Sequence, residues 1–324
     1  MPHAIKLYQT GDPEVMRFEE SNFVEPGSGE VLLRHTAIGV NYIDVYFRNG
    51  LYPQPMPGAL GKEAVGVVEA VGSGVTDVKV GDRVAYCNGQ LGAYSESRVI
   101  PAEFLVRLPD GIGDADAAAM LLKGLTVQYL FRQTYRLREG ETFLFHVAAG
   151  GVGLIACQWA RALGARMIGT VGSDEKAALA KAHGCEYVIN YRKENFVERV
   201  KELTDGKGVG VVYDSVGRDT FPSSLDCLKP RGLWVSFGNA SGAVPPFEIN
   251  MLAQKGSLFV TRPSLFSYAD SRSALLAMSE ELFSLMQSGK VQTVLRHRFP
   301  LKDAAEAHRL LESRSSTGAM VLIP

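Results

Sequence analysis

At 324 residues the chain is long enough for two domains of ordinary size, and its 46% hydrophobic and 21% charged residues are typical of a folded globular protein. The formal net charge of -1 gives no electrostatic reason to expect a nucleic acid or an anionic membrane as partner. The four cysteines lie too far apart for a C-x-x-C pair, which excludes a zinc ribbon or dithiol redox motif and favours a reducing compartment, the cytoplasm; they are Cys87, Cys157, Cys185 and Cys227.

Two stretches bear on the question of a membrane. Residues 1–14 carry Lys6, Asp12 and Glu14 and have no apolar core, so we expect no signal peptide. Residues 142–160 contain no formally charged side chain and are nearly long enough to cross a bilayer. Because this second stretch contains a Gly-Gly pair, His146 and Gln158, we do not expect it to span a membrane.

Short runs of β-type residues fill the first third of the chain. They cover residues 31–38, 65–71 and 83–86, and glycine-rich turns such as Gly72-Ser73-Gly74 separate them. No long amphipathic helix is evident between residues 3 and 107. The pattern predicts a largely antiparallel β domain.

Helical and strand patterns alternate after residue 114. A helical zone begins there, with Asp114 or Asp116 as its N-cap. Predicted strands at residues 143–147, 166–171, 187–189, 209–213 and 233–237 alternate with predicted helices at 152–163, 174–183, 195–203 and 220–228. Five strands with four intervening helices predict an α/β fold, a doubly wound parallel sheet of the Rossmann type.

The C-terminal residues are expected to return to the β domain. A strand at 257–260 and a loop at 262–264 precede a helix around residues 275–285, and residues 299–323 show a strand, a helix and a final strand. Because the parallel sheet already has its strands, this tail belongs with the first domain. We therefore predict one domain at 1–125, completed by 263–324, and a dinucleotide-binding domain at 126–262.

The turn after residue 147 carries the first sign of chemistry. It has the spacing A-x-G-x-x-G, in which Gly150 leaves room for a pyrophosphate and Gly153 lets strand and helix pack closely. The N–H groups that begin the helix, including those of Gly151 and Val152, are available to an anion. Taken alone, the motif also fits an ordinary glycine-rich turn. The alternating strands and helices favour a dinucleotide site.

The end of the next strand predicts which dinucleotide binds. An NAD site presents an acidic residue about 20 positions after the glycines, where this chain has Gly172-Ser173. Lys176 and Tyr191 can reach a 2′-phosphate, one by its charge and the other by its hydroxyl. We therefore predict NADPH rather than NADH. Asp174 and Glu175 are the open alternative, since a carboxylate facing the ribose would reverse the preference.

Several motifs together resemble a known family. They are G-V-N-Y-I-D from Gly39, G-L-Y-P from Gly50, L-K-G-L-T from Leu122, H-V-A-A-G-G-V-G from His146, Y-D-S-V-G from Tyr213 and V-S-F-G from Val235. Across nearly its whole length the chain is similar to zinc-independent quinone oxidoreductases of the zeta-crystallin type, in the medium-chain dehydrogenase/reductase superfamily. The resemblance implies that the first domain is a mostly β, GroES-like catalytic domain.

The resemblance also implies a set of site residues. Asn41, Asp44 and Tyr46 are expected near the nicotinamide and the substrate as the catalytic group, and Arg314 is expected near the 2′-phosphate. The expected cofactor-binding residues are Asn41, Tyr46, Thr126, Gly150, Gly151, Val152, Gly172, Ser173, Lys176, Tyr191, Ser215, Phe237, Gly238 and Arg314. A plainer interpretation remains for three of them, since Tyr46 and Phe237 also suit a hydrophobic core and Arg314 a surface.

The chain departs from the alcohol dehydrogenases of the superfamily at the zinc positions. Those enzymes carry a zinc-binding cysteine where this chain has Asn41 or Tyr42, and Gly-His-Glu where it has Gly61-Lys62-Glu63. The lobe of four closely spaced cysteines is also missing after Cys87. Without thiolate or imidazole ligands at this spacing we expect no metal. The Tyr-x-x-x-Lys pair of short-chain dehydrogenases is absent as well.

These expectations combine into a predicted function. We expect NADPH-dependent reduction of a quinone in a zinc-free cleft between the two domains, with Asn41 and Tyr46 shaping the acceptor side. One alternative is an NADPH-dependent reductase of activated double bonds, such as those of enones and alkenals. Another is a non-catalytic NADPH-binding or RNA-associated protein, as some zeta-crystallin relatives are. We expect a homodimer, with the apolar strand at residues 258–260 as the edge that pairs.

Overall fold

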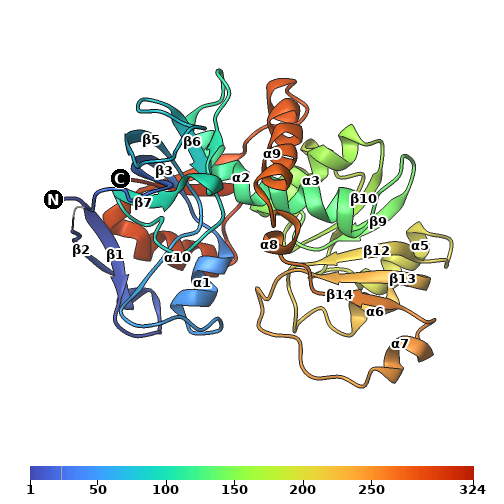
Figure 1. Cartoon of the computed structure of the whole chain (residues 1–324). Helices are drawn as coiled ribbons and strands as arrows, with labels where there is room; N and C mark the ends of the chain where they lie inside the picture. Colours follow the sequence, from blue (N-terminus) through green and yellow to red (C-terminus); the bar gives the residue numbers. More distant parts are fainter. Residues whose placement is uncertain (23) are drawn as a thin grey trace. The chain divides into compact units, whose positions relative to one another are not determined.

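Two units, each built on its own β-sheet, make up the chain (Figure 1). The computed structural model describes residues 1–22 and 24–324. The first unit contains Met1–Leu125, Ala269–Ser288 and Thr293–Pro324, and the second contains Thr126–Tyr268 and Gly289–Gln292. Both ends of the chain lie in the first unit.

The first unit has a large, mostly antiparallel sheet in the order β15-β16-β3-β5-β6-β8, with β7 also paired to β3. Its strands are β3 (Glu30–Gly39), β5 (Ala64–Val71), β6 (Arg83–Tyr86), β7 (Ser97–Pro101), β8 (Val106–Arg107), β15 (Leu295–Pro300) and β16 (Ala319–Ile323). A small second sheet has the order β2-β1-β4, formed by β1 (His3–Leu7), β2 (Arg17–Glu20) and β4 (Gly58–Ala59). The C-terminal tail returns to this unit, since β16 pairs with β3.

Alternating apolar residues explain how this unit closes. The buried side chains of β3, β5 and β6, such as Leu33, Val68 and Val84, face a common core with Leu7 and Leu322 from the two ends of the chain. Helices α1 (Tyr42–Arg48), α9 (Arg272–Gln287) and α10 (Ala304–Glu312) and three short 3-10 turns complete it. Helix α2 (Asp114–Tyr129) begins in this unit and ends in the second.

Helix α1 was not predicted from the sequence. Its residues are Y-I-D-V-Y-F-R, a β-branched and aromatic composition that is typical of a strand. The helix forms because Asn41 and Asp44 make a capping box, in which the Asn41 N–H donates to Asp44 Oδ2 at 2.9 Å. The capping pair was the local signal that the composition obscured.

The second unit is a six-stranded parallel sheet in the order β11-β10-β9-β12-β13-β14. The strands are β9 (Thr142–Phe145), β10 (Arg166–Val171), β11 (Tyr187–Asn190), β12 (Val209–Asp214), β13 (Leu228–Ser236) and β14 (Phe259–Thr261). Numbered within the unit this order is 3-2-1-4-5-6, the doubly wound arrangement that binds dinucleotides. The predicted fold class is confirmed, and β14 adds a sixth strand to the five expected.

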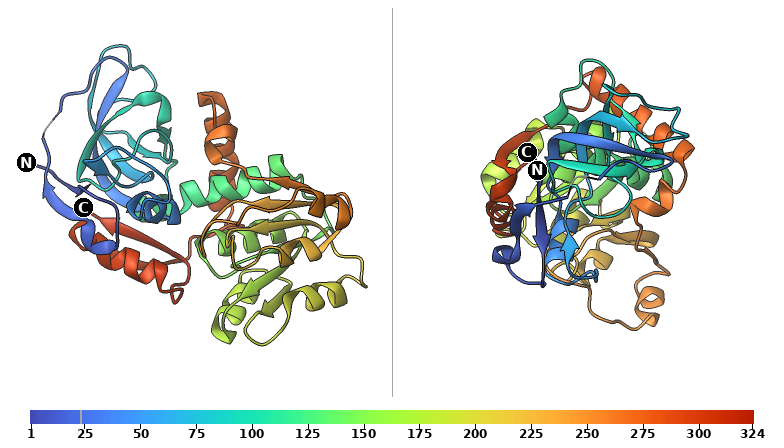
Figure 2. Two further views of the ribbon diagram at one scale, coloured as in Figure 1. Left: turned by 90° about the horizontal axis from the view of Figure 1, so that it is seen from below. Right: turned by 60° about the vertical axis from the view of Figure 1, so that its left-hand side comes forward.

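The helices of the second unit lie on both faces of its sheet (Figure 2). Helix α3 (Gly151–Ala162) packs beside α4 (Asp174–Ala182), and α5 (Phe196–Leu203) packs beside α6 (Ser223–Asp226). Short helices α7 (Asn250–Gln254) and α8 (Leu265–Tyr268) and a π-helical turn at Leu130–Thr134 follow the same chain. Every residue of the central strand β12 is buried, as expected for a strand covered on both sides.

One predicted helix is much shorter than expected, and the following strand is longer. The helical pattern at 220–228 yields only the four residues of α6, which begins after Pro222, a residue without an N–H group. Strand β13 starts at Leu228 instead of residue 233. The intervening Lys-Pro-Arg-Gly resembles a turn, but the register shift between Val209 and Val211 of β12 accommodates it within the sheet.

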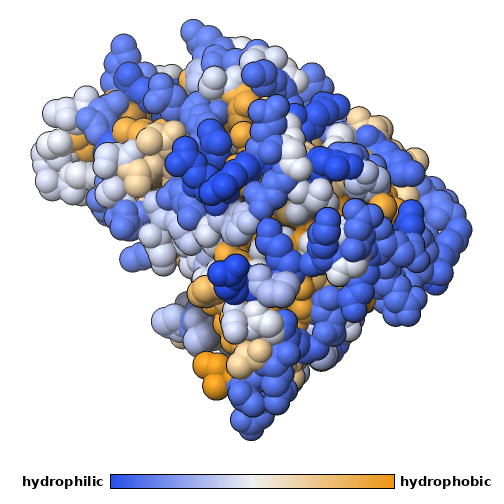
Figure 3. All heavy atoms as spheres, turned by 90° about the vertical axis from the view of Figure 1, so that its right-hand side faces the viewer, coloured by the Kyte–Doolittle hydropathy of each residue, from blue (hydrophilic) through white to orange (hydrophobic). Residues whose placement is uncertain are grey.

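Within the described ranges no helix combines the length and the apolar character that a bilayer crossing needs. The face drawn in Figure 3 is largely hydrophilic, and its hydrophobic residues are scattered among polar ones. Scattered apolar residues of this kind are normal on folded proteins.

Candidate active site

The turn between β9 and α3 has the geometry of an anion-binding loop. Gly150 is the N-cap of α3 in extended backbone, and α3 begins at Gly151. The Ala148 N–H donates to the Thr170 carbonyl at 3.0 Å, which ties the turn to β10. The predicted residues Gly150, Gly151 and Val152 therefore lie at the helix N-terminus, where N–H groups lack partners within the helix.

The two glycines of the turn serve different purposes. A Cβ on Gly153 would lie 2.2 Å from the Val147 carbonyl oxygen and 2.6 Å from the Ala148 carbonyl carbon, so the backbone itself excludes a side chain there. A Cβ on Gly150 would lie 3.1 Å from the Val147 side chain and 3.4 Å from the Val147 carbonyl oxygen, so the backbone leaves room for it. Val147 has a left-handed φ of 63° and is 41% exposed, an unfavourable conformation for a β-branched residue that is typical of functional turns.

We expect Gly153→Ala and Gly150→Ala to separate folding from binding. Gly153→Ala should lower the free energy of unfolding by about 1–3 kcal/mol, since the backbone must move to admit the methyl group. Gly150→Ala should unfold near the wild-type temperature and bind a dinucleotide more weakly, because the methyl group occupies the approach to the phosphates. Thermal unfolding and fluorescence titration measure the two effects. Equal unfolding temperatures for the two variants would contradict this assignment.

The ends of β10 and β11 bring together the residues predicted for the 2′-phosphate. The Tyr191 hydroxyl lies over Gly172, where a Cβ would be 2.6 Å from it. Ser173 is the N-cap of α4, and its hydroxyl accepts the Lys176 N–H at 3.3 Å. Partial burial and the nearby Arg192 charge lower the pKa of Lys176. Gly172, Ser173, Lys176 and Tyr191 therefore form one polar cluster.

The two acidic residues of this region do not act alike. Asp174 accepts hydrogen bonds from Asn190 and Lys193, and these contacts lower its pKa. Its carboxylate is thus paired with a lysine that the sequence reasoning did not consider. Hydrogen bonds from its own backbone N–H and from the Ser173 hydroxyl lower the pKa of Glu175. Arg192 was missed as a second cation of the cluster, although it directly follows the predicted Tyr191.

Asp214 organises the opposite side of the same sheet edge. Its buried carboxylate accepts hydrogen bonds from the hydroxyls of Thr220 (2.7 Å) and Ser224 (2.8 Å) and from the Val216 N–H (2.8 Å), and its pKa is lowered despite the burial. These bonds fix the loop that contains the predicted Ser215. The Asp214 carboxylate is fully engaged in holding that loop.

Gly238 lies against this loop, and Phe237 precedes it. A Cβ on Gly238 would be 2.5 Å from the Ser215 carbonyl oxygen, so the two predicted residues are in direct backbone contact. Phe237 packs on Phe145 at 5.6 Å between ring centroids and is only partly buried. The second unit thus brings Ser215, Phe237 and Gly238 together at the carboxyl ends of β12 and β13, where such sheets bind ligands.

The predicted catalytic residues of the first unit surround the start of α1. Asn41 and Tyr46 are almost completely buried, and Asp44 is completely buried. Burial raises the pKa of Asp44 to about 7, although hydrogen bonds from the Asn41 N–H and the Tyr94 hydroxyl oppose the shift. Asp44 Oδ1 has no hydrogen-bond partner among the described residues. The contacts of Asp44 are internal, which favours a role in holding α1.

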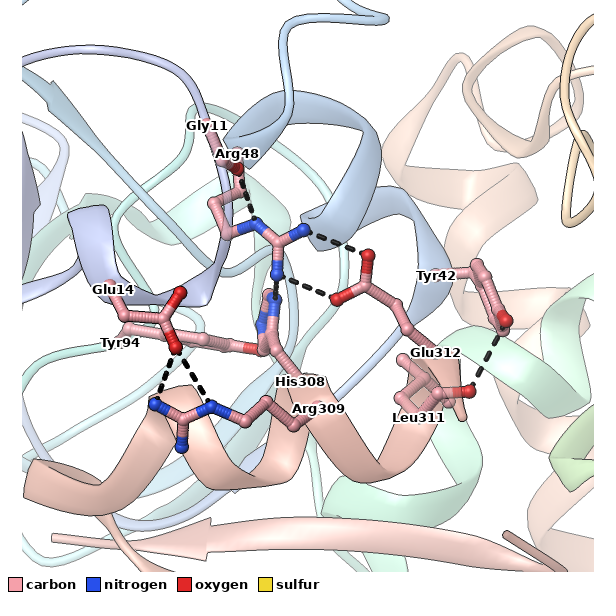
Figure 4. Close-up of polar contacts among 9 residues, drawn as sticks. All are labelled: Gly11, Glu14, Tyr42, Arg48, Tyr94, His308, Arg309, Leu311 and Glu312. Carbon is pink, nitrogen blue, oxygen red and sulfur yellow. Dashed lines mark hydrogen bonds and ion pairs between the residues drawn. The ribbon is translucent and has the colours of Figure 1, made fainter. Parts of the chain in front are cut away.

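A polar network links Asp44 to helix α10, and Figure 4 shows the part of it formed by Arg48, Tyr94, His308 and Glu312. Arg48 donates to Glu312 through two bonds of 2.7 and 2.8 Å and to His308 Nδ1 at 3.4 Å. Because a guanidinium only donates, His308 must carry its proton on Nε2, which lies 3.0 Å from the Tyr94 hydroxyl. Tyr94 in turn donates to Asp44 Oδ2 at 3.1 Å. The hydrogen bonds from Arg48 through His308 and Tyr94 therefore all run toward Asp44, while two further Arg48 bonds hold Glu312.

Because of His308, we expect the protein to lose stability in acid. Burial and the Arg48 charge lower the pKa of His308 to about 3, so the unfolded chain binds a proton below the ordinary pKa of about 6.5 and the folded chain does not. Protonation of His308 in the unfolded chain therefore lowers the free energy of unfolding as the pH falls below about 6.5, and this loss is absent above that pH. Asp44, whose pKa is raised, acts in the opposite direction over the same range.

The comparison with His308→Gln isolates this contribution. Between pH 7 and pH 5 the wild type should lose about 1–2 kcal/mol more unfolding free energy than the variant does. Urea denaturation at the two pH values measures the difference. An identical loss in both proteins would show that His308 does not titrate differently in the folded chain.

Glu63 and Lys123 form a buried ion pair beside Asn41 that the sequence did not predict. Glu63 is completely buried, and its Oε2 lies 2.8 Å from Asn41 Nδ2 and 3.7 Å from Lys123 Nζ. Its Oε1 accepts the Leu122 N–H at 2.6 Å. Burial raises the pKa of Glu63, and the Lys123 charge and the donated bonds oppose that shift. A lysine within the apolar α2, in the motif L-K-G-L-T, was the available signal.

The two remaining predicted residues, Thr126 and Arg314, belong to different units. Thr126 belongs to α2 and is buried in the second unit. Arg314 follows α10 in the first unit, exposed and with a left-handed φ of 59°. Their roles at a cofactor stay predictions. The glycine turn and the polar cluster at the carboxyl ends of the parallel strands define the class as a dinucleotide-binding protein.

Comparison with known proteins agrees with this class. The family models described as "Alcohol dehydrogenase GroES-like domain" and "Zinc-binding dehydrogenase" match residues 27–110 and 151–280. A quinone oxidoreductase of Pseudomonas aeruginosa is 58% identical over the full length of both chains. The crystal structure of Escherichia coli quinone oxidoreductase complexed with NADPH has a TM-score of 0.98 at 54% identity and covers 99% of this chain and 100% of its own. A 2-haloacrylate reductase of Burkholderia is 45% identical over 100% of this chain and 99% of its own.

The chain belongs to the quinone oxidoreductase family of the medium-chain dehydrogenase/reductase superfamily. Although one matching model is described as zinc-binding, the side chains at the expected ligand positions are the amide of Asn41, the phenol of Tyr42 and the ammonium of Lys62. These groups are poor ligands for zinc. In residues 1–22 and 24–324 no three His, Cys, Asp or Glu side chains are grouped to hold a metal ion.

Proposed function

We propose that the chain catalyses the reduction of quinones by NADPH. Full-length similarity to a quinone oxidoreductase solved with NADPH is the observation that carries the proposal. The polar cluster at the end of β10 supports the same cofactor, because Gly172 makes room for the Tyr191 hydroxyl and Lys176 and Arg192 supply positive charge for a 2′-phosphate.

The residues divide the work between the two units. In the second unit, Gly150, Gly151 and Val152 hold the pyrophosphate at the α3 N-terminus, and Ser173, Lys176 and Tyr191 hold the 2′-phosphate. Ser215, Phe237 and Gly238 support the nicotinamide half, with Thr126 beside them and Arg314 contributing to the phosphate side from the first unit. We assign the cofactor to the predicted domain 126–262 and the acceptor to 1–125 with 263–324.

The bound cofactor supplies the reducing electrons, and residues of the first unit bind and orient the acceptor. Asn41 and Tyr46 lie at the start of α1, and the amide of Asn41 is a hydrogen-bond donor suited to a quinone oxygen. Quinone carbonyls accept electrons readily, so positioning and hydrogen-bond donation suffice for their activation. Asp44 holds the capped start of α1, on which both residues depend.

Consumption of NADPH in the presence of a simple quinone tests the proposal directly. We expect steady turnover with 1,4-benzoquinone and a lower KM for NADPH than for NADH. The control lacks the quinone and should consume no NADPH. Absence of turnover with several quinones, by a protein that binds NADPH, would contradict the proposed reaction and favour the non-catalytic or RNA-associated alternative.

A second candidate is the reduction of activated double bonds. The relative named 2-haloacrylate reductase is 45% identical over the whole chain, so a closely similar framework is associated with an alkene substrate. An enone or a haloacrylate presents an oxygen acceptor beside the double bond, as a quinone does. Comparing kcat/KM for 1,4-benzoquinone, an alkenal and 2-chloroacrylate decides between the two candidates.

We also propose a homodimer located in the cytoplasm. Strand β14 is the edge of the parallel sheet, and its Phe259 and Val260 are 60% and 42% exposed, which supports pairing with a second copy. The four cysteines are free thiols, which supports a reducing compartment. Sedimentation of the wild type and of Phe259→Lys tests the dimer, since a charge in a paired edge should give monomers.

A further inference from the structure

The side-chain amide of Asn41 is fixed by contacts on two sides. Its Nδ2 donates to Glu63 Oε2 at 2.8 Å, and its other side belongs to the capping box that begins α1. An amide nitrogen carries two hydrogens, and Glu63 accepts one of them. The Asn41 nitrogen makes no further hydrogen bond among the described residues, so its second N–H remains available.

Glu63 is itself held in a single orientation. Oε1 accepts the Leu122 N–H at 2.6 Å, and Oε2 faces both Asn41 and the Lys123 ammonium. Gly39 makes room for the carboxylate, since a Cβ there would lie 2.2 Å from Oε2. Strand β5 begins directly after Glu63, so the carboxylate connects the ends of two strands with the middle of α2. An ionised carboxylate accepts at both oxygens, which fixes the direction of the Asn41 amide.

The charge of Lys123 favours the ionised form of the Glu63 carboxylate, on which this arrangement depends. Its ammonium is buried 3.7 Å from Glu63 Oε2 and forms no hydrogen bond with any described residue. A buried carboxylate without a counter-charge would take up a proton, and a protonated Glu63 could donate instead of accepting. The Lys123 charge therefore preserves the direction of the Glu63–Asn41 hydrogen bond.

We propose that Glu63 is a positioning residue that turns the second N–H of Asn41 toward the reducible oxygen of the acceptor. This inference rests on the proposed function, because it assigns Asn41 to the acceptor. Negative charge develops on a quinone or enone oxygen as it is reduced, and a donor held in place stabilises that charge without reorganising. The site therefore favours acceptors that present a carbonyl oxygen beside the reduced position.

The proposal can be tested by exchanging the amide and the carboxylate between positions 41 and 63. In Glu63→Gln the side-chain oxygen of the new glutamine still accepts the Leu122 N–H. Its side-chain nitrogen then faces the Asn41 nitrogen, so two hydrogen-bond donors face each other. Adding Asn41→Asp restores a donor–acceptor pair in the reverse direction and returns the carboxylate lost at position 63. Aspartate is also a good N-cap, so the start of α1 is preserved. The double variant keeps the net charge of the cluster but has no N–H to offer the acceptor.

The expected results separate structure from donation. Glu63→Gln should lower the unfolding temperature and reduce kcat/KM for 1,4-benzoquinone by about 10- to 100-fold. The double variant should regain most of the unfolding temperature and bind NADPH, measured by fluorescence without acceptor, as the wild type does. Its kcat/KM should stay about 100-fold low.

Three outcomes would overturn the proposal. They are full activity of Glu63→Gln, recovery of activity together with stability in the double variant, and no recovery of the unfolding temperature in the double variant. Asp114→Asn is the matched control, because it removes a carboxylate paired with Arg83 at the start of the same helix and should leave kcat/KM unchanged. Lack of quinone turnover by the wild type would instead refute the proposed function, so the two failures are distinguishable.

Discussion

Lys123→Met is expected to lower the free energy of unfolding by about 3–5 kcal/mol. The substitution keeps the length of the side chain and its apolar packing but removes the ammonium next to the completely buried Glu63. The buried Glu63 carboxylate would then lack a counter-charge to offset the free energy of its desolvation. Asp44, also completely buried, interacts with the same lysine and should be affected with it. Urea denaturation of the cofactor-free protein at pH 7 measures the change.

A second substitution shows whether the loss comes from the unpaired charge. In Glu63→Gln combined with Lys123→Met, neither charge remains, so at least half of the lost stability should return. Lys181→Met removes an exposed lysine from α4 and should change stability by about 0.5 kcal/mol or less. If the double variant is as unstable as the sum of the single ones, the pair does not act as a unit.

Ser173→Asp should weaken NADPH binding at least about tenfold relative to NADH, which corresponds to about 1.4 kcal/mol. The new carboxylate would stand at the N-terminus of α4, in the cluster of Gly172, Lys176 and Tyr191, where it repels a 2′-phosphate. A ribose hydroxyl, by contrast, can donate to it. Because aspartate is as good an N-cap as serine, the helix should be retained.

Asn195→Asp is the matched control for this change. Asn195 is the N-cap of α5 and accepts the Val197 N–H at 3.0 Å, so the substitution adds the same charge at a comparable position in the same unit. Dissociation constants for NADPH and NADH, measured by fluorescence for both variants, give the comparison. Equal weakening of the two cofactors by Ser173→Asp would contradict a 2′-phosphate at this cluster.

The architecture was predictable where local patterns repeat. The alternation of β-type and helical segments after residue 140 indicated a doubly wound parallel sheet, and the structure has it. The glycine turn and the Gly172-Ser173 strand end are also local, because the backbone rules that create them act within a few residues. Helix α1 was missed because its composition favours a strand, and only the Asn41–Asp44 capping pair indicates otherwise.

The polar interior of the first unit could not be predicted in the same way. Asn41 and Glu63 are 22 residues apart, and Arg48 and His308 are 260 apart. No periodicity connects such residues, since their contact depends on how the sheet closes. A buried charge is visible in a sequence only as an exception within an apolar segment, as Lys123 is in α2. Its partner can be identified only from the folded chain.

The position of β16 has a consequence for the order of folding during synthesis. This strand and β15 form one end of the large sheet, so that sheet lacks its last two strands until the ribosome has released residues 295–323. All but four residues of the second unit have emerged by residue 268. The parallel sheet can therefore fold while the end of β3 at Ile38 and Gly39 still lacks its partner, and that nascent edge is where chaperone protection is most needed.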